Sequence, residues 1–190
     1  AAQMSGSVGP NSCDLIIYTA ALEHMQKEAG YSSLEECYKI LKPGGVLFLT
    51  TPNTLQKKDP YDTQFKVLLY EWDLEETTAA LKDIGFNIDA THGLMGKIRD
   101  FEPWLEENEP QVFKFYKRIK EYVPSHFITS VMAVPFPEAA CEVAYIATKR
   151  EAGQVASFDS FFRDDEPEEA PTWDLGIEED EDDGAVWYNN

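Results

Sequence analysis

The sequence has few basic residues and no long apolar run. Its 190 residues contain 16 lysines and arginines against 35 acidic residues, which gives a formal net charge of −19. Such a chain lacks the basic surface that a phosphate backbone requires, so nucleic acid is disfavoured as a tightly bound partner. No apolar run reaches the roughly 20 residues of a membrane span. With no signal peptide recognisable, we expect no membrane partner and a cytoplasmic location.

Cysteine and histidine are also scarce. The chain has three of each: Cys13, Cys37, Cys141, His24, His92 and His126. The cysteines are widely spaced and odd in number, and neither set has the spacing of a metal site. We therefore expect reduced thiols and no bound metal.

The negative charge is concentrated at one end of the chain. Residues 151–190 contain 14 acidic residues and one arginine, Arg163, so −13 of the total −19 lies there. This composition predicts a domain over 1–150 followed by a disordered acidic tail over 151–190. The tail also contains aromatic residues: Phe158, Phe161, Phe162, Trp173, Trp187 and Tyr188. It is either a solubilising tail or a segment that docks onto a basic, apolar groove.

The stretch 40–53 has the features of a helix end, a turn and a buried strand. Pro43 is expected to stop a helix over 33–42, and Gly44-Gly45 to allow a sharp reversal. Ser33 and Glu36 have the spacing of a capping box for that helix. Residues 46–49 are all apolar, as in a parallel strand covered on both faces. A second apolar strand at 14–19 completes a strand–helix–strand unit, which predicts an α/β fold with parallel neighbours.

Three motifs in this region resemble one known family. They are Asp-Leu-Ile-Ile-Tyr-Thr-Ala-Ala-Leu-Glu-His at 14–24, Leu-Lys-Pro-Gly-Gly at 41–45 and Thr-Thr-Pro-Asn at 50–53. In order and spacing they resemble the class I S-adenosylmethionine-dependent methyltransferases, over residues 12–149. The resemblance implies a partial Rossmann-like methyltransferase sheet, S-adenosylmethionine as cofactor and a small-molecule methyl acceptor. Another Rossmann-like enzyme is the generic alternative, against which the Leu-Glu-His and Leu-Lys-Pro-Gly-Gly motifs argue.

The later part of the domain continues the α/β pattern. Asp73 is a typical N-cap residue and Gly85 a typical residue just past a helix end, so together they predict a helix over 73–84. Strands are predicted at 86–91 and 142–149, and the resemblance implies that the last strand is antiparallel to its neighbour. Residues 97–140 break the alternation and predict a helical insertion, either packed on the core or forming a cap over the substrate.

The resemblance also suggests site residues. The backbone of Tyr18, Thr19 and Ala20 would face the methionine part of the cofactor, or is plain strand-end packing. His24 is either a general base toward a hydroxyl substrate or a structural group at the helix start. Asn53 either touches substrate or closes an Asx turn. Some relatives carry a metal-linked acid at the position of Ala20, where alanine has no ligand atom.

One expected feature is absent from the sequence. The family places a glycine-rich cofactor loop and a ribose-binding acid upstream of the strand at 14–19, and residues 1–13 supply neither. The strand at 14–19 would therefore be an apolar edge, which an upstream segment or another protein chain is expected to cover. This absence supports a second hypothesis, a non-catalytic binding or scaffold subunit that engages a partner through its acidic aromatic tail.

Overall fold

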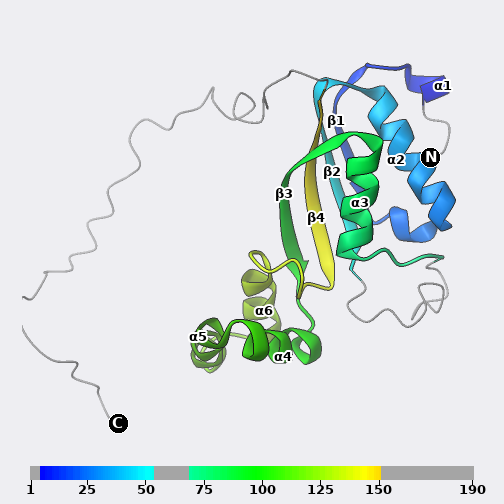
Figure 1. The fold of residues 1–190 in the computed structure, drawn as a ribbon. Helices are drawn as coiled ribbons and strands as arrows, with labels where there is room; N and C mark the ends of the chain where they lie inside the picture. The colour runs from blue at the N-terminus through cyan, green and yellow to red at the C-terminus, as the bar shows by residue number, and fades with distance from the viewer. Residues whose placement is uncertain (1–4, 54–68, 151–190) are drawn as a thin grey trace, which may run out of the picture. The chain divides into compact units, whose positions relative to one another are not determined.

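The computed structural model describes residues 5–53 and 69–150, so the predicted tail lies outside the described residues. Helices and strands alternate around a four-stranded sheet (Figure 1). No helix in these two ranges has the length and apolar composition needed to cross a membrane. In chain order the elements are α1 (Ser5–Val8), β1 (Cys13–Thr19), the 3-10 helix η1 (Leu22–His24), α2 (Lys27–Ile40), β2 (Leu41–Pro52), α3 (Leu74–Ile84), β3 (Phe86–Met95), α4 (Ile98–Asn108), α5 (Pro110–Lys120), α6 (Ser125–Ala133) and β4 (Glu142–Lys149).

The sheet has the strand order β1-β2-β4-β3. β1 and β2 are parallel neighbours joined through α2, with Leu15 opposite Val46 and Thr19 opposite Thr50. β4 lies between β2 and β3 and is antiparallel to both. The predicted α/β class, the parallel first pair and the antiparallel last strand are therefore confirmed.

The prediction for the first long helix was wrong at its start. α2 begins at Lys27, and its N-cap residue, Gln26, makes no side-chain cap. Ser33 is fully buried inside the helix, where its hydroxyl donates to the carbonyl of Gly30 at 2.7 Å. Ser33 and Glu36 are thus not a capping box. A buried serine can satisfy its hydroxyl on the preceding turn of its own helix, and this is the role seen here.

The predicted reversal after α2 is a bulge at the start of β2. α2 ends at Ile40, and β2 begins at the next residue. The register moves from Cys13 opposite Leu41 to Leu15 opposite Val46, so β2 contains extra residues there. Gly44 has a φ of 80°, a left-handed conformation that glycine adopts without strain. A Cβ on Gly45 would lie 2.9 Å from the carbonyl oxygen of Lys42, so only glycine fits.

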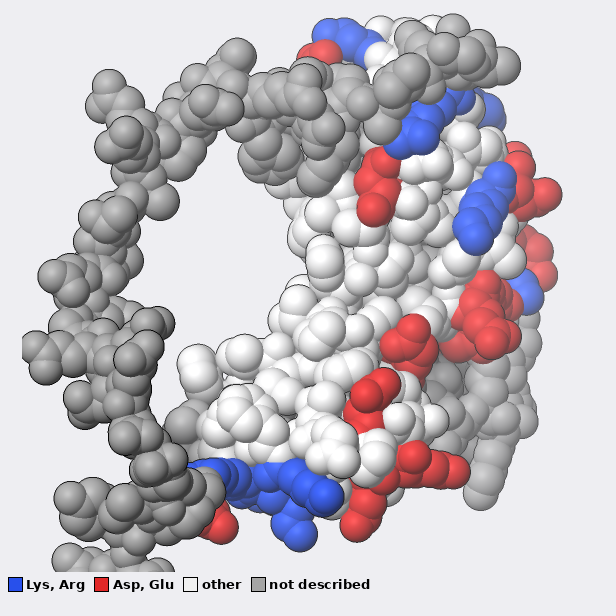
Figure 2. Space-filling view, turned by 60° about the vertical axis from the view of Figure 1, so that its left-hand side comes forward, with Lys and Arg blue, Asp and Glu red and all other residues white. Residues whose placement is uncertain are grey.

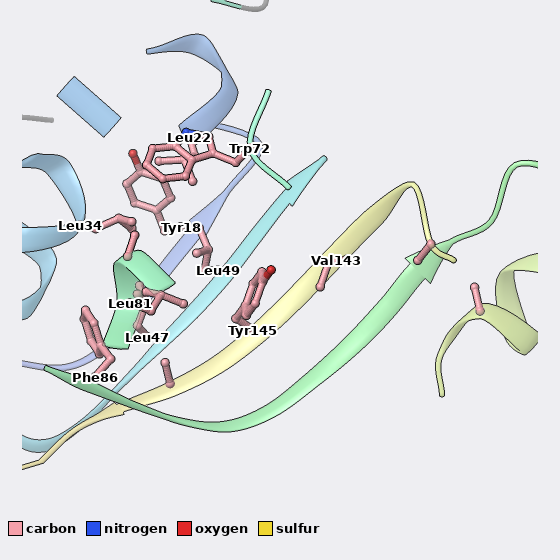
Figure 3. Close-up of a cluster of buried hydrophobic side chains, with 14 of the residues drawn as sticks. Tyr18, Leu22, Leu34, Leu47, Leu49, Trp72, Leu81, Phe86, Val143 and Tyr145 are labelled. Atoms are coloured by element: carbon pink, nitrogen blue, oxygen red, sulfur yellow. The ribbon is translucent and has the colours of Figure 1, made fainter. Parts of the chain in front are cut away.

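The hydrophobic core lies between the sheet and the two helices on one of its faces (Figures 1 and 3). Its fully buried side chains come from several elements and include Leu34, Leu47, Leu49, Leu81 and Tyr145. In contrast, Leu15 and Ile17 of β1 are 45% and 68% exposed. Successive strand residues face opposite ways, so these two lie on the face away from α2. Among the described strands, β1 is therefore an apolar edge, as predicted.

Local sequence signals correctly located α3. The Asp73 carboxylate accepts from the backbone N–H of Glu76 at 2.7 Å and caps the first turn. Gly85 ends the helix in a left-handed conformation with a φ of 112°. The chain then enters β3 directly at Phe86, whose ring is buried. α3 therefore packs next to the strand that follows it.

The predicted insertion over 97–140 is helical and comprises α4, α5 and α6 (Figure 1). Pro110 lies in the first turn of α5, where a proline is tolerated because its missing N–H has no partner within the helix. Tyr116 is fully buried and its hydroxyl is 2.8 Å from the Thr129 hydroxyl on α6. Phe115 and Tyr122, in contrast, are 57% and 82% exposed. The aromatic residues of this segment are therefore divided between the packed face of α5 and its surface.

Candidate functional site

One edge of the sheet brings together the ends of four strands. Pro52 of β2 and Met95 of β3 both lie opposite Glu142, the first residue of β4. β1 is parallel to β2, so its carboxyl end at Thr19 lies at the same edge. Helices α4 to α6 connect β3 to β4 and therefore start and finish here (Figure 1). Ligands of open α/β sheets bind at the carboxyl ends of parallel strands.

The chain makes a strained turn where β1 ends. Ala20 has a φ of 48°, a left-handed conformation that costs a residue with a Cβ about 1–2 kcal/mol. Thr19 and Ala20 are both exposed. Their peptide groups are therefore open to a ligand at this edge. Ala20 has no ligand atom for a metal, and residues 5–53 and 69–150 contain no cluster of three histidine, cysteine or carboxylate side chains suited to one.

The side chain of Tyr18 points away from this edge. It is 7% exposed and lies in the core beneath α2, where its hydroxyl is 2.8 Å from that of Ser33 (Figure 3). Burial raises the pKa of the Tyr18 phenol, so the side chain stays neutral. Of the three predicted cofactor contacts, Tyr18 can therefore contribute its backbone alone, whereas Thr19 and Ala20 are exposed as whole residues.

Glu23 is a buried carboxyl group within the Leu-Glu-His motif, and its burial was not predicted. It lies in η1 and is 5% exposed, and its Oε2 has no hydrogen-bond partner in the described part of the chain. Burial raises the pKa of Glu23, and the charge of Glu142 adds to this, while His24 opposes it. Its motif neighbour His24 is exposed. Burial depends on distant segments, so the Leu-Glu-His motif indicated the place of Glu23 but not its environment.

We expect the Glu23→Gln substitution to stabilise the protein above neutral pH and to have a smaller effect in acid. A raised folded-state pKa means that the unfolded state releases its proton first as the pH rises. The buried group therefore favours the folded state below about pH 4.5, the ordinary value. That contribution is lost as the pH rises through the folded-state pKa. Urea unfolding of both proteins between pH 4 and pH 8 measures the difference.

The matched control is Glu106→Gln, because Glu106 is an exposed carboxylate on α4. It should change the free energy of unfolding by a similar small amount at every pH. A Glu23→Gln effect that is independent of pH would show that the Glu23 carboxyl is not desolvated.

Asn53 connects three segments at the end of β2. Its Nδ2 donates to the carbonyl oxygens of Pro137 and Ala140, at 3.2 and 2.9 Å. Its Oδ1 accepts from the backbone N–H of Leu74 at 2.9 Å, and its own N–H donates to Cys141. Both amide hydrogens are thus engaged, and Asn53 is 8% exposed. The backbone N–H that an Asx turn would engage, that of residue 55, lies outside the described residues, so that alternative stays a prediction. The amide ties β2 to α3 and to the loop before β4, which leaves one acceptor position for a substrate.

Trp72 forms part of the packing beneath the η1 turn. Its side chain is 1% exposed and lies beside Leu22 (Figure 3). An added Cβ on Gly30 would meet both side chains, at 3.0 Å from Leu22 and 3.2 Å from Trp72, so α2 approaches them closely here. The indole N–H is buried without a hydrogen-bond partner among the described residues. Trp72 therefore supports the η1 turn, which carries Glu23 and His24, through apolar contact.

Sequence comparison connects this edge to known proteins. A family model described as a methyltransferase domain matches residues 2–49, which include β1, the η1 turn, α2 and most of β2. A probable S-adenosylmethionine-dependent methyltransferase from Mycolicibacterium smegmatis is 31% identical over 84 residues. The match covers 44% of this chain and 32% of the relative, so the chain spans about a third of the length of that protein.

The solved structures that this chain matches include methyltransferases. One is an S-adenosylmethionine-dependent methyltransferase from Archaeoglobus fulgidus, with a TM-score of 0.48, 15% identity and coverage of 78% of this chain and 64% of that one. Another is the 1,6-didemethyltoxoflavin-N1-methyltransferase of Burkholderia thailandensis, with a TM-score of 0.43, 11% identity and coverage of 75% and 46%. In its sequence matches and its strand-end motifs, the chain is similar to the class I S-adenosylmethionine-dependent methyltransferases.

Proposed function

We propose that this chain is the part of a methyltransferase that holds the methionine end of S-adenosylmethionine and presents a small-molecule acceptor to it. The observation that carries the proposal is the strained, exposed turn at Thr19 and Ala20, at the edge where α4 to α6 also begin and end. Strained backbone is retained where the surrounding structure holds it in place, often at a ligand site. When bound, the cofactor supplies an activated methyl group.

The protein's task is then mainly alignment. A sulfonium methyl group needs little acid–base assistance, so holding the acceptor atom in line provides most of the rate. In this proposal, the peptide groups of Thr19 and Ala20 bind the methionine end. His24, which is exposed on the same turn, accepts a proton from an acceptor hydroxyl. No step requires a metal, which fits the absence of a ligand atom at Ala20.

The α4–α6 insertion is proposed as the cover of the acceptor. The insertion begins at the carboxyl edge of the sheet. Three exposed apolar side chains lie where β3 ends and α4 begins: Leu94, Met95 and Ile98. Acceptor pockets are lined mostly by apolar groups with a few polar ones. This composition favours a small, partly apolar acceptor over a polyanion.

A second function is favoured by one sequence observation. In the 40 residues before β2, no glycine-rich loop follows an apolar strand, and such a loop normally holds the cofactor. A non-catalytic binding or scaffold subunit would retain this sheet without transferring methyl groups. The two functions differ in cofactor binding, which can be measured directly.

The test is calorimetric titration with S-adenosylmethionine. Residues 1–190 alone are expected to bind weakly, because they lack the glycine-rich loop and the ribose-binding acid. A fusion that adds an upstream segment with a glycine-rich cofactor loop and a ribose-binding acid should bind in the micromolar range. In the fusion, His24→Asn should lower methyl transfer to hydroxyl acceptors by about 100-fold while leaving cofactor affinity unchanged.

His92→Asn is the control, since His92 is an exposed histidine on β3 outside the η1 turn. Failure of the fusion to bind the cofactor, although folded, would favour the scaffold function. Micromolar binding of S-adenosylmethionine by residues 1–190 alone would contradict the proposal, because it would show that no added upstream segment is needed to hold the cofactor.

A further inference from the structure

Asn53 connects the end of β2 to the α4–α6 insertion. Its Nδ2 donates two hydrogen bonds to the end of this insertion, to the carbonyl oxygens of Pro137 and Ala140 at 3.2 and 2.9 Å. Both carbonyls belong to the loop that returns from α6 to β4. Asn53 is 8% exposed and Ala140 is fully buried, so water competes little for these hydrogen bonds.

The contacts of Asn53 require a side-chain amide. Its Oδ1 accepts from the backbone N–H of Leu74, the first residue of α3, at 2.9 Å, while Nδ2 faces the two carbonyls. The side chain must therefore supply an acceptor on one side and two donors on the other, which is the chemistry of an Asn or Gln amide. Glutamine is longer by one methylene and would not bring both atoms to the same positions. Both the shape and the chemistry of asparagine are thus used.

A second contact joins the insertion to a different strand. α6 ends against β3, where the N–H of Gly93 donates to the carbonyl of Val134 at 3.2 Å, and the carbonyl of Ala133 leaves no room for a Cβ on Gly93. This contact alone would let the insertion pivot about β3. The Asn53 contacts come from β2, which lies on the other side of β4. Attachments to two separated strands together fix the orientation of the insertion.

We propose that Asn53 is a positioning residue, which sets the orientation of the α4–α6 insertion over the carboxyl edge of the sheet. This inference rests on the proposed function, in which the insertion covers the acceptor while Thr19 and Ala20 hold the cofactor. Asn53 follows β2, the neighbour of β1, so it connects the strand pair that carries the cofactor side to the cover of the acceptor. Methyl transfer depends on this alignment, because a displacement of about 1 Å can lower the rate about 100-fold.

The surface between the sheet and the insertion depends on the same orientation. Figure 2 shows this surface hollowed where the sheet, above, meets α4 to α6, below, and the residues in the hollow are uncharged. Lysine and arginine side chains gather instead at the lower edge of the molecule, where α4 to α6 lie in Figure 1. A rotation of the insertion would change the shape of this hollow and move its lower wall relative to the strand ends.

The experiment compares residual dipolar couplings of ¹⁵N-labelled residues 1–190 with those of the Asn53→Asp variant. Aspartate has the shape of asparagine and keeps an acceptor for the Leu74 N–H, but it loses at least one of the two donations to the insertion. We expect the sheet and the insertion of the unmodified chain to share one alignment tensor. In the variant, the couplings of α4–α6 should shrink by about a third or more, as for a segment that moves on the sheet, while the sheet couplings stay unchanged. A residue that only stabilises the fold would lower the free energy of unfolding and leave the shared tensor intact.

Asn108→Asp is the matched control, because Asn108 is exposed at the end of α4 and donates within its own helix, to the carbonyl of Trp104. It should leave the couplings unchanged. In the fusion described above, with catechol as the probe acceptor, Asn53→Asp should raise the KM for catechol about tenfold or more and leave cofactor affinity unchanged.

A single shared tensor in the Asn53→Asp variant, or an unchanged KM for catechol, would overturn the proposal. A fusion that binds no cofactor or leaves catechol unmethylated would count against the proposed function instead. The couplings of residues 1–190 decide the role of Asn53 in that case, because their measurement needs neither cofactor nor acceptor.

Discussion

Replacing Gly93 by alanine should destabilise the protein by about 3 kcal/mol, at the upper end of the range for overpacking. Gly93 lies in β3 where α6 ends against the strand, and its N–H donates to Val134 at 3.2 Å. A Cβ there would lie 2.2 Å from the carbonyl oxygen of Ala133 and 2.7 Å from the Cβ of Ala140. Both neighbours are backbone or rigidly attached to it. The helix must therefore move away from the sheet.

Urea unfolding measures this loss, with Gly6→Ala as the matched control. A Cβ on Gly6 meets no atom within 4 Å, and Gly6 lies in α1, where alanine is favoured over glycine. That substitution should leave stability unchanged or raise it by up to about 1 kcal/mol. An equal, small effect at both positions would show that α6 is not held against β3 as described.

Trp72→Ala should lower the free energy of unfolding by about 4 kcal/mol, as expected for removing a fully buried indole. The side chain fills the space between η1 and α2, beside Leu22 and Gly30, and alanine would leave a cavity there. The loss should also loosen the turn that carries Glu23 and His24. In the fusion described above, cofactor binding should weaken together with stability.

Trp72→Phe distinguishes packing from hydrogen bonding. It keeps most of the apolar contact and removes an indole N–H that has no partner within the described ranges. Removing the unsatisfied N–H removes its desolvation cost, and this gain offsets part of the packing lost with the smaller ring. We therefore expect the free energy of unfolding to fall by no more than about 1.5 kcal/mol. Equal losses for the alanine and phenylalanine variants would mean that the N–H does make a hydrogen bond.

Elements with strong local signals were predicted closely, and those formed by distant contacts were not. Asp73 and Gly85 cap α3 through their own neighbours, so the sequence was sufficient. α2 begins without a side-chain cap, and Ser33 resembles a cap only because its buried environment cannot be read from its neighbours. The bulge at Gly44 depends on the register with β1, which a single strand does not reveal.

In the candidate site, too, features set by local sequence could be predicted, whereas those set by distant contacts could not. The strand-end position of Thr19 and Ala20 followed from the apolar strand before them. The left-handed backbone of Ala20 could not be predicted, because alanine has no preference for that conformation. The role of Asn53 depends on carbonyl groups 84 and 87 residues later in the chain. Burial of Glu23 likewise requires the folded sheet.

The position of β4 has a consequence for synthesis of the chain. β2 and β3 share no hydrogen bonds, because β4 lies between them, yet β4 is the last of the described strands to be made. Roughly 90 residues separate Pro52 from Glu142, which at about 5–20 residues per second delays closure by about 5–20 seconds. During that interval β2 lacks β4, the strand that pairs with it in the folded sheet. A nascent chain of this protein is therefore expected to need chaperone protection until residue 149 leaves the ribosome.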